Sequence, residues 1–199
     1  MKLLLKARDV WIEAEKKIIL KEVNLEISEG EFLWLEGKTG AGKSRLLKVL
    51  SFAENSSNGD IVSVKKFPLL AENATLLQND SVKENLKLAA PLADTLDTSE
   101  LLNAIGLFEK RNQKADSLSA GEKRLLKLAT FLILETELIF LDEPFGRMDA
   151  ETQLPAFKTI LEKNRKNTAV LIASAGPCPD DSPVKTRKLT LKDGKLYEE

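Results

Sequence analysis

The sequence contains no histidine, one cysteine and no long uninterrupted apolar run. The single Cys178 cannot form an internal disulfide, which suits a reducing compartment, and its proline and aspartate neighbours indicate a loop thiol rather than a nucleophile. The longest apolar stretch, residues 125–141, is interrupted by three charged side chains, so it does not predict a membrane span. No signal peptide is predicted, because the apolar run at residues 1–5 is short and charges follow it.

Neither sign of charge prevails in the chain. Its 30 basic and 31 acidic side chains leave a formal net charge of −1. A dedicated nucleic-acid binder usually carries a basic face, so this balance argues against nucleic acid as a partner. A chain of 199 residues can bury a core of its own, and we expect one domain over residues 1–199.

A glycine-rich segment at residues 37–44 fits the pattern G-x-x-x-x-G-K-[ST] at each fixed position. Its three glycines let the backbone approach phosphates and turn successive N–H groups toward them. Lys43 offers a positive charge to the β- and γ-phosphates, and Ser44 offers a hydroxyl to Mg²⁺. A predicted strand at residues 31–36 enters the segment and a predicted helix at residues 44–50 leaves it. We therefore expect a nucleotide triphosphate site rather than a glycine-rich turn without a ligand.

Two carboxylates follow a second apolar strand, which is predicted at residues 138–141. At the end of that strand, Asp142 suits a magnesium site near Ser44, and Glu143 suits a base that orients or deprotonates an attacking water. An apolar run that ends in Asp-Glu-Pro is common by itself. Downstream of a complete phosphate-binding loop, it indicates nucleotide chemistry.

The remaining pattern predicts an α/β fold. Residues 3–27 alternate apolar and polar side chains, as antiparallel strands do, and residues 188–197 predict a hairpin with an Asp-Gly turn. Between them strands alternate with helices, which predicts a mostly parallel sheet flanked by helices in three layers, with a small helical subdomain at about residues 79–134. The other predicted helices are residues 82–88, 99–108, 122–134 and 152–163, and the other predicted strands are residues 59–64 and 169–173.

The chain resembles the ATP-binding cassette (ABC) family, the nucleotide-binding subunits of ABC transporters. The resemblance covers nearly the whole chain, and its most specific element is Leu118-Ser119-Ala120-Gly121-Glu122, which is similar to the family signature Leu-Ser-Gly-Gly-Gln. It implies a P-loop NTPase core of the ABC type with an N-terminal antiparallel β subdomain. It also implies that the signature meets the γ-phosphate held by an opposite subunit, so that two ATP molecules lie between two head-to-tail protomers. The alternative is an ordinary helix start capped by Ser119.

Three further positions match the family. Gln78 stands where the family has its Q-loop glutamine, a Mg²⁺ ligand and a sensor of the transmembrane partner; alternatively, it only ends a strand. Trp11 stands where an aromatic residue stacks on adenine, although it could equally pack on the sheet. Asp149 matches the aspartate of the D-loop, and the nearby Arg147 is unusual for the family and could be a solvated loop charge.

The resemblance assigns a role to each of these residues. Catalysis falls to Glu143, Lys43 and Gln78, and the Mg²⁺ ligands are Ser44, Gln78 and Asp142. Nucleotide binding falls to Trp11, Gly37, Lys38, Thr39, Gly40, Ala41, Gly42, Lys43, Ser44 and Arg45, and the signature in trans is Ser119, Ala120, Gly121 and Glu122.

The chain departs from the family pattern in three places. Ala120 replaces a signature glycine, which some exporter ATPases tolerate, and Glu122 replaces glutamine, which puts a carboxylate near the partner's triphosphate unless it points away. Ala175 stands where the family has its switch histidine, which contacts the γ-phosphate. Because the chain has no histidine, no neighbour can replace it. We expect tight Mg·ATP binding with slow hydrolysis.

The expected function is that of an ATPase subunit, with ATP and Mg²⁺ as ligands, that energises a transmembrane permease from the cytoplasmic face of a membrane. The second ABC subunit would be another copy or a different chain, and the short intervals between motifs and the Ser-Ala-Gly signature favour an exporter. The alternative is an ATP-gated regulatory or structural module, in cell division or envelope remodelling, with little turnover. A soluble ABC protein of translation or DNA repair is disfavoured, because such proteins usually carry two cassettes or long coiled-coil insertions.

Overall fold

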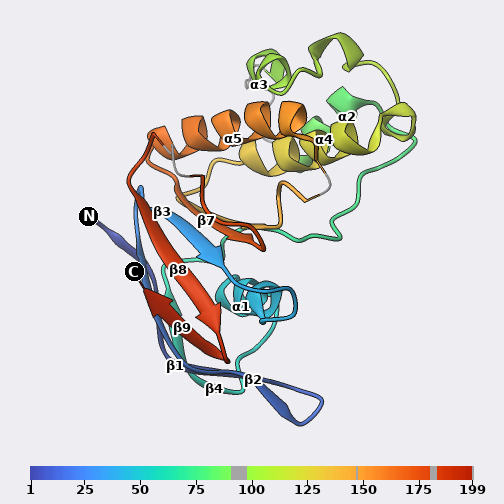
Figure 1. The fold of residues 1–199 in the computed structure, drawn as a ribbon. Helices are drawn as coiled ribbons and strands as arrows, with labels where there is room; N and C mark the ends of the chain where they lie inside the picture. Colours follow the sequence, from blue (N-terminus) through green and yellow to red (C-terminus); the bar gives the residue numbers. More distant parts are fainter. Residues whose placement is uncertain (91–97, 147, 180–182, 199) are drawn as a thin grey trace. The chain divides into compact units, whose positions relative to one another are not determined.

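The computed structural model describes residues 1–90, 98–146, 148–179 and 183–198, and Figure 1 shows the course of the chain. The chain forms two compact units. The first comprises Met1–Ala71, Thr136–Glu143 and Asn164–Glu199, and the second comprises Glu72–Glu135 and Pro144–Lys163.

Two sheets make up most of the first unit. The antiparallel sheet has the strand order β2-β1-β4, formed by Lys17–Ser28, Leu3–Ala14 and Asn58–Ser63. The larger sheet has the order β5-β6-β7-β3-β8-β9, formed by Leu69–Leu70, Leu138–Asp142, Ala169–Ser174, Phe32–Glu36, Thr186–Lys192 and Lys195–Glu198. Its strands are parallel except β9, which pairs with β8 in an antiparallel hairpin.

Helix α1, Lys43–Leu50, packs against β1, β6 and β7 and thus contacts both sheets of the first unit. Strand β6 is buried along its whole length, as expected for an apolar strand in the interior of a parallel sheet. Strand β1 instead mixes buried and exposed residues. The common core includes Leu33 and Leu35 of β3, Leu46 and Leu47 of α1 and Leu171 of β7. Burial of each such side chain stabilises the fold by about 1.5–3 kcal/mol.

Helices make up most of the second unit. They are α2 (Val82–Ala89), α3 (Thr98–Ala104), α4 (Ala120–Leu132) and most of α5 (Ala150–Arg165), with two short 3-10 helices at Phe108–Lys110 and Ala115–Ser117. Helix α2 packs against α4. Within the described ranges, no helix combines the length and apolar character needed to cross a bilayer.

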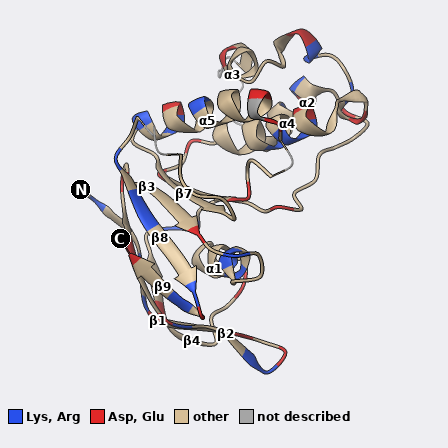
Figure 2. Ribbon diagram, in the orientation of Figure 1, with Lys and Arg blue, Asp and Glu red and all other residues tan. Residues whose placement is uncertain are grey.

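The expected fold class is confirmed, including the antiparallel N-terminal strands and the Asp-Gly hairpin, in which Asp193 and Gly194 both have positive φ. The helices predicted at residues 122–134 and 152–163 each begin two residues earlier in the structure, as α4 and α5, and the helix predicted at residues 99–108 is wrong in its extent. Helix α3 ends at Ala104, not near Phe108, because Gly106 takes a left-handed conformation (φ +72°) and Leu107 N–H donates to Leu102 O at 2.8 Å. Figure 2 shows basic and acidic residues interspersed along the elements of both units.

Candidate nucleotide site

The phosphate-binding loop follows β3 and enters α1, as the sequence predicts. Two of its glycines are required by their surroundings. A Cβ on Gly37 would lie 2.7 Å from Leu191 O, and a Cβ on Gly42 would lie 3.0 Å from side-chain atoms of both Ile19 and Leu20. Gly42 has φ +103° and Gly40 has φ +83°, a region that L-residues with a side chain rarely adopt. The loop thus has the tight, glycine-dependent backbone that the phosphate-binding pattern requires.

The N-terminus of α1 lacks the side-chain cap that two other helices have. Its N-cap residue is Gly42, and its first turn contains no acidic residue. By contrast, α2 begins with a Ser81–Glu84 capping box and α4 with a Ser119–Glu122 capping box. The first N–H groups of α1, and the positive end of its dipole, are thus available to an anion held by the loop.

Lys43 joins the loop to the second motif. Its side chain is only 6% exposed, and Nζ donates to Gly37 O at 2.8 Å and to Lys38 O at 3.4 Å. Nζ also lies 3.5 Å from Glu143 Oε1. The ammonium group is therefore fixed between the carbonyl oxygens of the phosphate loop and the predicted catalytic carboxylate.

The register of the parallel sheet explains why these groups meet. Asp142, the last residue of β6, is paired with Ala173 of β7, and Ser174 of β7 is paired with Glu36, the last residue of β3. The loop that follows β3 therefore shares one sheet edge with Asp142. Such carboxyl ends of strands are where open α/β sheets place their ligands.

Glu143 lies directly beyond that edge. Its N–H donates to Ala173 O at 2.9 Å, and its φ of +47° is uncommon for a residue with a side chain. Backbone strain of this kind costs on the order of 1–3 kcal/mol and persists where the surrounding structure imposes it, often at active sites. Seven other non-glycine residues among those described also have positive φ, so this conformation agrees with a functional role for Glu143 but does not by itself assign one.

Asp142 and Ser44 form a donor set that fits Mg²⁺. Asp142 is 4% exposed, and Ser44 is the second residue of α1, the helix that packs on β6. Throughout the described ranges, no three His, Cys, Asp or Glu side chains converge into a metal site. An aspartate and a serine hydroxyl are ligands of the kind Mg²⁺ takes, because the ion usually binds one or two protein oxygens and completes its shell with waters and substrate phosphates.

The position of the expected switch histidine is well ordered by hydrogen bonds. Ala175 directly follows β7 and is exposed. Gly176 N–H donates to Ser174 Oγ at 3.1 Å, and Trp34 Nε1 donates to Gly176 O at 3.2 Å. A methyl group therefore stands just beyond the end of β7, where it can form no hydrogen bond.

Gln78 lies in a turn of the second unit, so it does not end a strand. Its side chain is exposed, with Nε2 3.4 Å from Leu76 O, and the backbone carbonyl of Gln78 accepts from Asp116 N–H at 3.0 Å. The buried Asn85, which the sequence analysis did not identify, holds this turn. Its amide accepts from Leu77 N–H at 2.9 Å and donates to Leu77 O and Ser81 O, each at 3.0 Å. Only the Ser81-x-x-Glu84 capping pattern could have pointed to an ordered turn here.

The signature segment begins α4, with Ser119 as the N-cap residue, so the capping alternative is correct as a description of local structure. Ser119 Oγ accepts from Glu122 N–H at 3.3 Å, and Glu122 Oε2 accepts from Ser119 N–H at 2.9 Å. The amide of Gly121 takes no part in this box, and a Cβ on Gly121 would meet only ordinary contacts, 3.6 Å from Thr152. Both Ser119 and Ala120 are exposed.

The Glu122 carboxylate points into its own unit. Its second oxygen, Oε1, accepts from Lys110 Nζ at 2.5 Å. This hydrogen bond from Lys110, together with those from Ser119, holds the pKa of Glu122 below its ordinary value despite partial burial. The carboxylate that replaces the family's glutamine therefore has partners within the chain.

Asp149 precedes α5 and acts as a cap for it. Its Oδ1 accepts from Thr152 N–H at 2.8 Å, and hydrogen bonding to the Thr152 side chain, together with this backbone bond, lowers the pKa of Asp149. Helix α5 begins at Ala150, two residues before the predicted start, because Asp149 provides this cap. Arg147 lies outside the described residues.

The remaining predicted binding residues lie on or near the loop. Lys38 and Thr39 are exposed and Ala41 is half-buried. Arg45 forms an ion pair with Glu54 at 3.7 Å, a geometry typical of a solvated surface pair. Trp11 is half-buried between the buried Val10 and Ile12 of β1, and its Nε1 donates to Asp9 Oδ1 at 3.0 Å.

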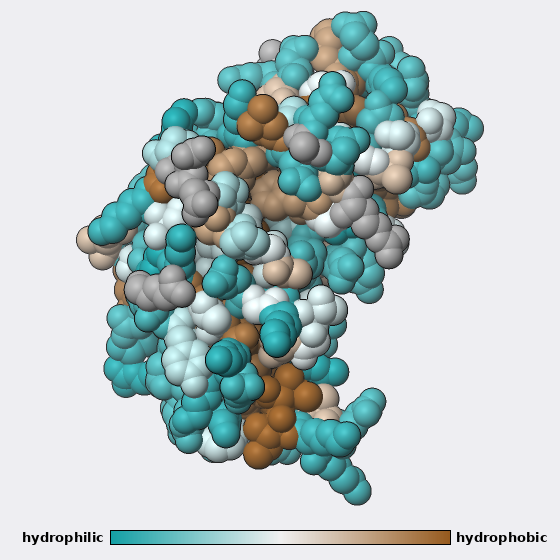
Figure 3. Space-filling view, in the orientation of Figure 1, coloured by the Kyte–Doolittle hydropathy of each residue, from teal (hydrophilic) through white to brown (hydrophobic). Residues whose placement is uncertain are grey.

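An apolar surface that the sequence analysis missed adjoins the loop. Ile19 and Leu20 of β2 lie next to Gly42, and the neighbouring Ile18 is 56% exposed. Figure 3 shows apolar surface gathered in the region of β2 and β9. Ile19 and Leu20 therefore border the phosphate loop at Gly42, and the apolar triplet at residues 18–20 was their only signal in the sequence.

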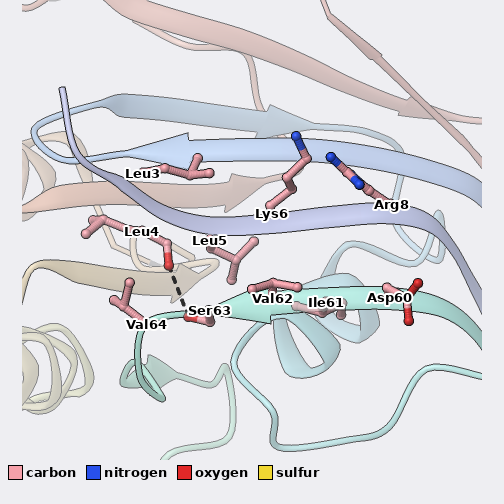
Figure 4. A pocket seen from close by; sticks show the side chains of 10 residues that line it. All are labelled: Leu3, Leu4, Leu5, Lys6, Arg8, Asp60, Ile61, Val62, Ser63 and Val64. Carbon is pink, nitrogen blue, oxygen red and sulfur yellow. Dashed lines mark hydrogen bonds between the residues drawn. The ribbon is translucent and has the colours of Figure 1, made fainter.

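A separate hollow of about 490 Å³ lies along β1 and β4 (Figure 4). Its lining is mostly aliphatic, with Lys6, Arg8 and Asp60 at one end, and Ser63 Oγ donates to Leu4 O at 3.2 Å. None of these residues belongs to the predicted nucleotide site. The hollow is open and offers no converging polar groups of the kind that orient a small ligand.

The predicted site residues divide between the two units. The first unit brings together the phosphate loop, Asp142, Glu143 and Ala175 at one sheet edge. The second contains Gln78, the signature and Asp149.

Comparisons with known proteins agree with this geometry. Residues 20–146, more than half of the chain, match the sequence model of the family described as ABC transporter. An aliphatic sulfonates import ATP-binding protein, SsuB of Zymomonas mobilis, is 33% identical over 164 residues, which cover 77% of this chain and 68% of that protein. The cell division ATP-binding protein FtsE of Mycobacterium tuberculosis is 29% identical over 203 residues, which cover 90% of this chain and 87% of that protein.

Solved structures show the same fold. The ATP-binding subunit of an ABC transporter superposes with a TM-score of 0.85 at 20% identity over 98% of this chain and 89% of that chain. An ABC transporter ATP-binding protein from Pyrococcus furiosus superposes with a TM-score of 0.80 at 26% identity over 94% of this chain and 96% of that chain. The family model, the relatives and the phosphate loop joined to Glu143 through Lys43 agree, and the chain belongs to the ATP-binding subunits of ABC transporters.

Proposed function

We propose that this chain binds and slowly hydrolyses Mg·ATP in order to drive a transmembrane partner at the cytoplasmic face of a membrane. The observation that carries the proposal is the 3.5 Å approach of Lys43 Nζ to Glu143 Oε1, which unites the phosphate loop with a candidate base. The family to which the chain belongs supports the same conclusion.

Phosphate binding rests on groups of the first unit. The uncapped N-terminus of α1 and the loop amides face an anion, and Lys43 exchanges its bonds to Gly37 O and Lys38 O for bonds to phosphate oxygens. The purine packs against β2 at Ile19 or stacks on Trp11. Both sites are apolar enough to hold it.

Ser44 and Asp142 are the side chains of the first unit that would hold Mg²⁺. When bound, the ion neutralises negative charge on the β- and γ-phosphate oxygens. Glu143, whose Oε1 lies 3.5 Å from Lys43 Nζ, orients the attacking water and accepts its proton.

Slow turnover follows from Ala175. A histidine at this position would donate a hydrogen bond to the γ-phosphate, and Ala175 cannot. The loss of one such contact in the transition state typically lowers the rate about a hundredfold to a thousandfold, whereas ground-state binding through Lys43 and the loop amides remains.

The complete site requires a second ABC subunit. In this arrangement Ser119 and the N–H of Gly121 reach the γ-phosphate bound by the opposite protomer, and ATP joins the two head to tail. Ser119 and Ala120 are exposed, and the Gly121 amide lies outside the capping box, as that role requires. The second subunit is either another copy of this chain or a different ABC chain.

The relatives inform both the direction of transport and the choice between the two candidate functions. The named relatives include an importer and a cell division protein, so the expectation of an exporter has no support from them. The FtsE relative, which aligns over most of both chains, favours a second candidate: an ATP-gated module that signals to a division complex with little turnover. The missing histidine agrees with that candidate, whereas the retained Glu143 agrees with hydrolysis.

Purification of the full chain from native membranes in mild detergent, with mass spectrometry of its partners, tests the proposal. Recovery of a multi-spanning permease with the wild type, and with Glu143→Gln in the presence of ATP, supports a transport subunit. Recovery of a membrane protein too small to form a pathway supports the ATP-gated module. Recovery of soluble proteins alone contradicts both candidates.

A further inference from the structure

The signature segment of this chain carries a negative charge that the family pattern lacks. Glu122 stands in place of glutamine at the start of α4. If the segment meets a triphosphate bound by another subunit, as in the proposed function, an uncompensated carboxylate there would repel the γ-phosphate. In the structure, a lysine pairs with this carboxylate and offsets its charge.

The Glu122 carboxylate uses both oxygens within its own unit. Oε2 accepts from the N–H of Ser119 at 2.9 Å, and Oε1 accepts from Lys110 Nζ at 2.5 Å. The ion pair is partly buried, with 23% of the Glu122 side chain and 41% of the Lys110 side chain exposed. Lys110 thus holds the carboxylate against the helix start and offsets its charge.

The backbone around Lys110 is fixed, so its ammonium group approaches Glu122 from a defined position. Lys110 N–H donates to Leu107 O at 3.0 Å, and Lys110 O accepts from Gln113 N–H at 2.9 Å. Next to it, the Arg111 guanidinium lies 4.3 Å from the centre of the Phe108 ring and donates to Phe108 O at 2.9 Å. This short turn is a support for the signature.

The same segment is tied to the turn that contains Gln78. Asp116 N–H donates to Gln78 O at 3.0 Å, Ala115 N–H donates to Asp80 O at 2.9 Å, and Lys83 N–H donates to Arg111 O at 2.9 Å. Lys110 is therefore anchored to the Q-loop side of the helical unit as well as to the signature.

We propose that Lys110 is a positioning residue of the signature: it keeps Glu122 in the capping box and offsets its charge, so that an acidic signature accepts the γ-phosphate of the opposite subunit. This inference rests on the proposed function. It predicts that Lys110 matters only while Glu122 is acidic, since glutamine can form the same capping box without a charge.

The test is a double-mutant cycle in the full chain, made in a Glu143→Gln parent that retains bound ATP. ATP-dependent dimerisation is measured by analytical ultracentrifugation for the parent, Lys110→Met, Glu122→Gln and the double variant. We expect Lys110→Met to weaken dimerisation about tenfold when Glu122 is present, which corresponds to about 1.4 kcal/mol, and less than about twofold when glutamine replaces it. Lys110→Arg retains the charge and should restore dimerisation.

Two controls separate positioning from a merely structural role. ATP affinity of the monomer should be unchanged by Lys110→Met, because the phosphate loop belongs to the other compact unit. If Lys110 only supports the fold, Lys110→Met should lower the melting temperature and weaken dimerisation equally whether residue 122 is glutamate or glutamine. Equal losses in these two backgrounds overturn the role of Lys110 and leave the proposed function unaffected. Failure of the Glu143→Gln parent to dimerise with ATP overturns the proposed subunit arrangement, and the inference with it.

Discussion

Lys43 Nζ lies 3.5 Å from Glu143 Oε1, although one residue begins the first helix and the other follows the strand β6. The pair is only partly exposed to solvent, with 6% of the Lys43 side chain and 24% of the Glu143 side chain accessible. The parallel register of β6, β7 and β3 brings them to one sheet edge. A lysine of the phosphate loop and a candidate base thus meet at one edge of the sheet.

Replacement of Lys43 should abolish tight nucleotide binding. Lys43→Ala removes the charge-assisted hydrogen bonds to the β- and γ-phosphates, each worth about 1.5–3 kcal/mol, so the Kd for Mg·ATP should rise about a hundredfold. Isothermal titration calorimetry measures this directly. The matched control is Lys48→Ala, in the same helix, whose ammonium pairs with Glu54 at 3.0 Å. Similar affinities for the two variants would contradict the assigned role of Lys43.

Installation of a histidine at the end of β7 should accelerate hydrolysis. Ala175→His restores a donor to the γ-phosphate, and we expect kcat to rise at least about tenfold, a part of the hundredfold or more that such a contact can supply. Ala175→Gln, which adds bulk without an imidazole, serves as the control. Fast turnover of the wild type that Ala175→His leaves unchanged would show that this position does not limit the rate.

Trp11 and β2 are alternative binding surfaces for the adenine ring, and tryptophan fluorescence distinguishes between them. The chain has two tryptophans, so Trp34→Phe leaves Trp11 as the only indole fluorophore. That change also removes the hydrogen bond from Trp34 to Gly176 O, at a cost of about 1 kcal/mol. If adenine stacks on Trp11, ATP should quench the emission and inorganic triphosphate should not. Unaltered emission at saturating ATP, together with weaker binding by Ile19→Ser, would place the base on β2 instead.

Removal of Lys110 should change the titration of Glu122. The pKa of Glu122 lies below 4.5, chiefly through its hydrogen bond from Lys110. A lowered pKa in the folded state contributes stability above pH 4.5, and that stability is lost as the pH falls through the lowered pKa. In Lys110→Met the Glu122 pKa should move up toward 4.5, as measured by carbon-detected NMR of the side-chain carboxylate. The Glu84 carboxylate, in the capping box of α2, should keep its own lowered pKa and serves as an internal reference.

Much of the fold could be predicted because the local residue patterns and the packing of the folded chain favour the same helices and strands. The glycine pattern at residues 37–44 specifies a loop between a strand and a helix, and the Asp193-Gly194 turn specifies a hairpin, so both appear where expected. The extent of α3 could not be predicted from its amphipathic pattern, which continues past Ala104. The left-handed turn at Gly106 decides the helix end, and Phe108–Lys110 beyond it form a 3-10 turn instead.

The supporting residues of the site were harder to find than the residues with a motif. Asn85 is a polar residue on an amphipathic helix, and only its burial reveals that it holds the turn around Gln78. Lys110 is one of many lysines in the sequence. Its contact with Glu122 depends on the conformation of the segment between α3 and α4. In the sequence Ile19 is an ordinary strand residue, and only the structure shows that it lies beside Gly42 of the phosphate loop. Such contacts come from tertiary structure, which the spacing of residues does not specify.

Single-turnover hydrolysis of bound Mg·ATP by the wild type and Glu143→Gln most directly tests whether Glu143 is the base. We predict that both bind Mg·ATP with similar Kd, that the wild type converts it slowly to ADP, and that Glu143→Gln is slower by about a hundredfold or more because it lacks a base. Glu36→Gln, at the same sheet edge, serves as the control and should hydrolyse ATP like the wild type. Equal rates for the wild type and Glu143→Gln, or no binding of Mg·ATP by either, would contradict this prediction.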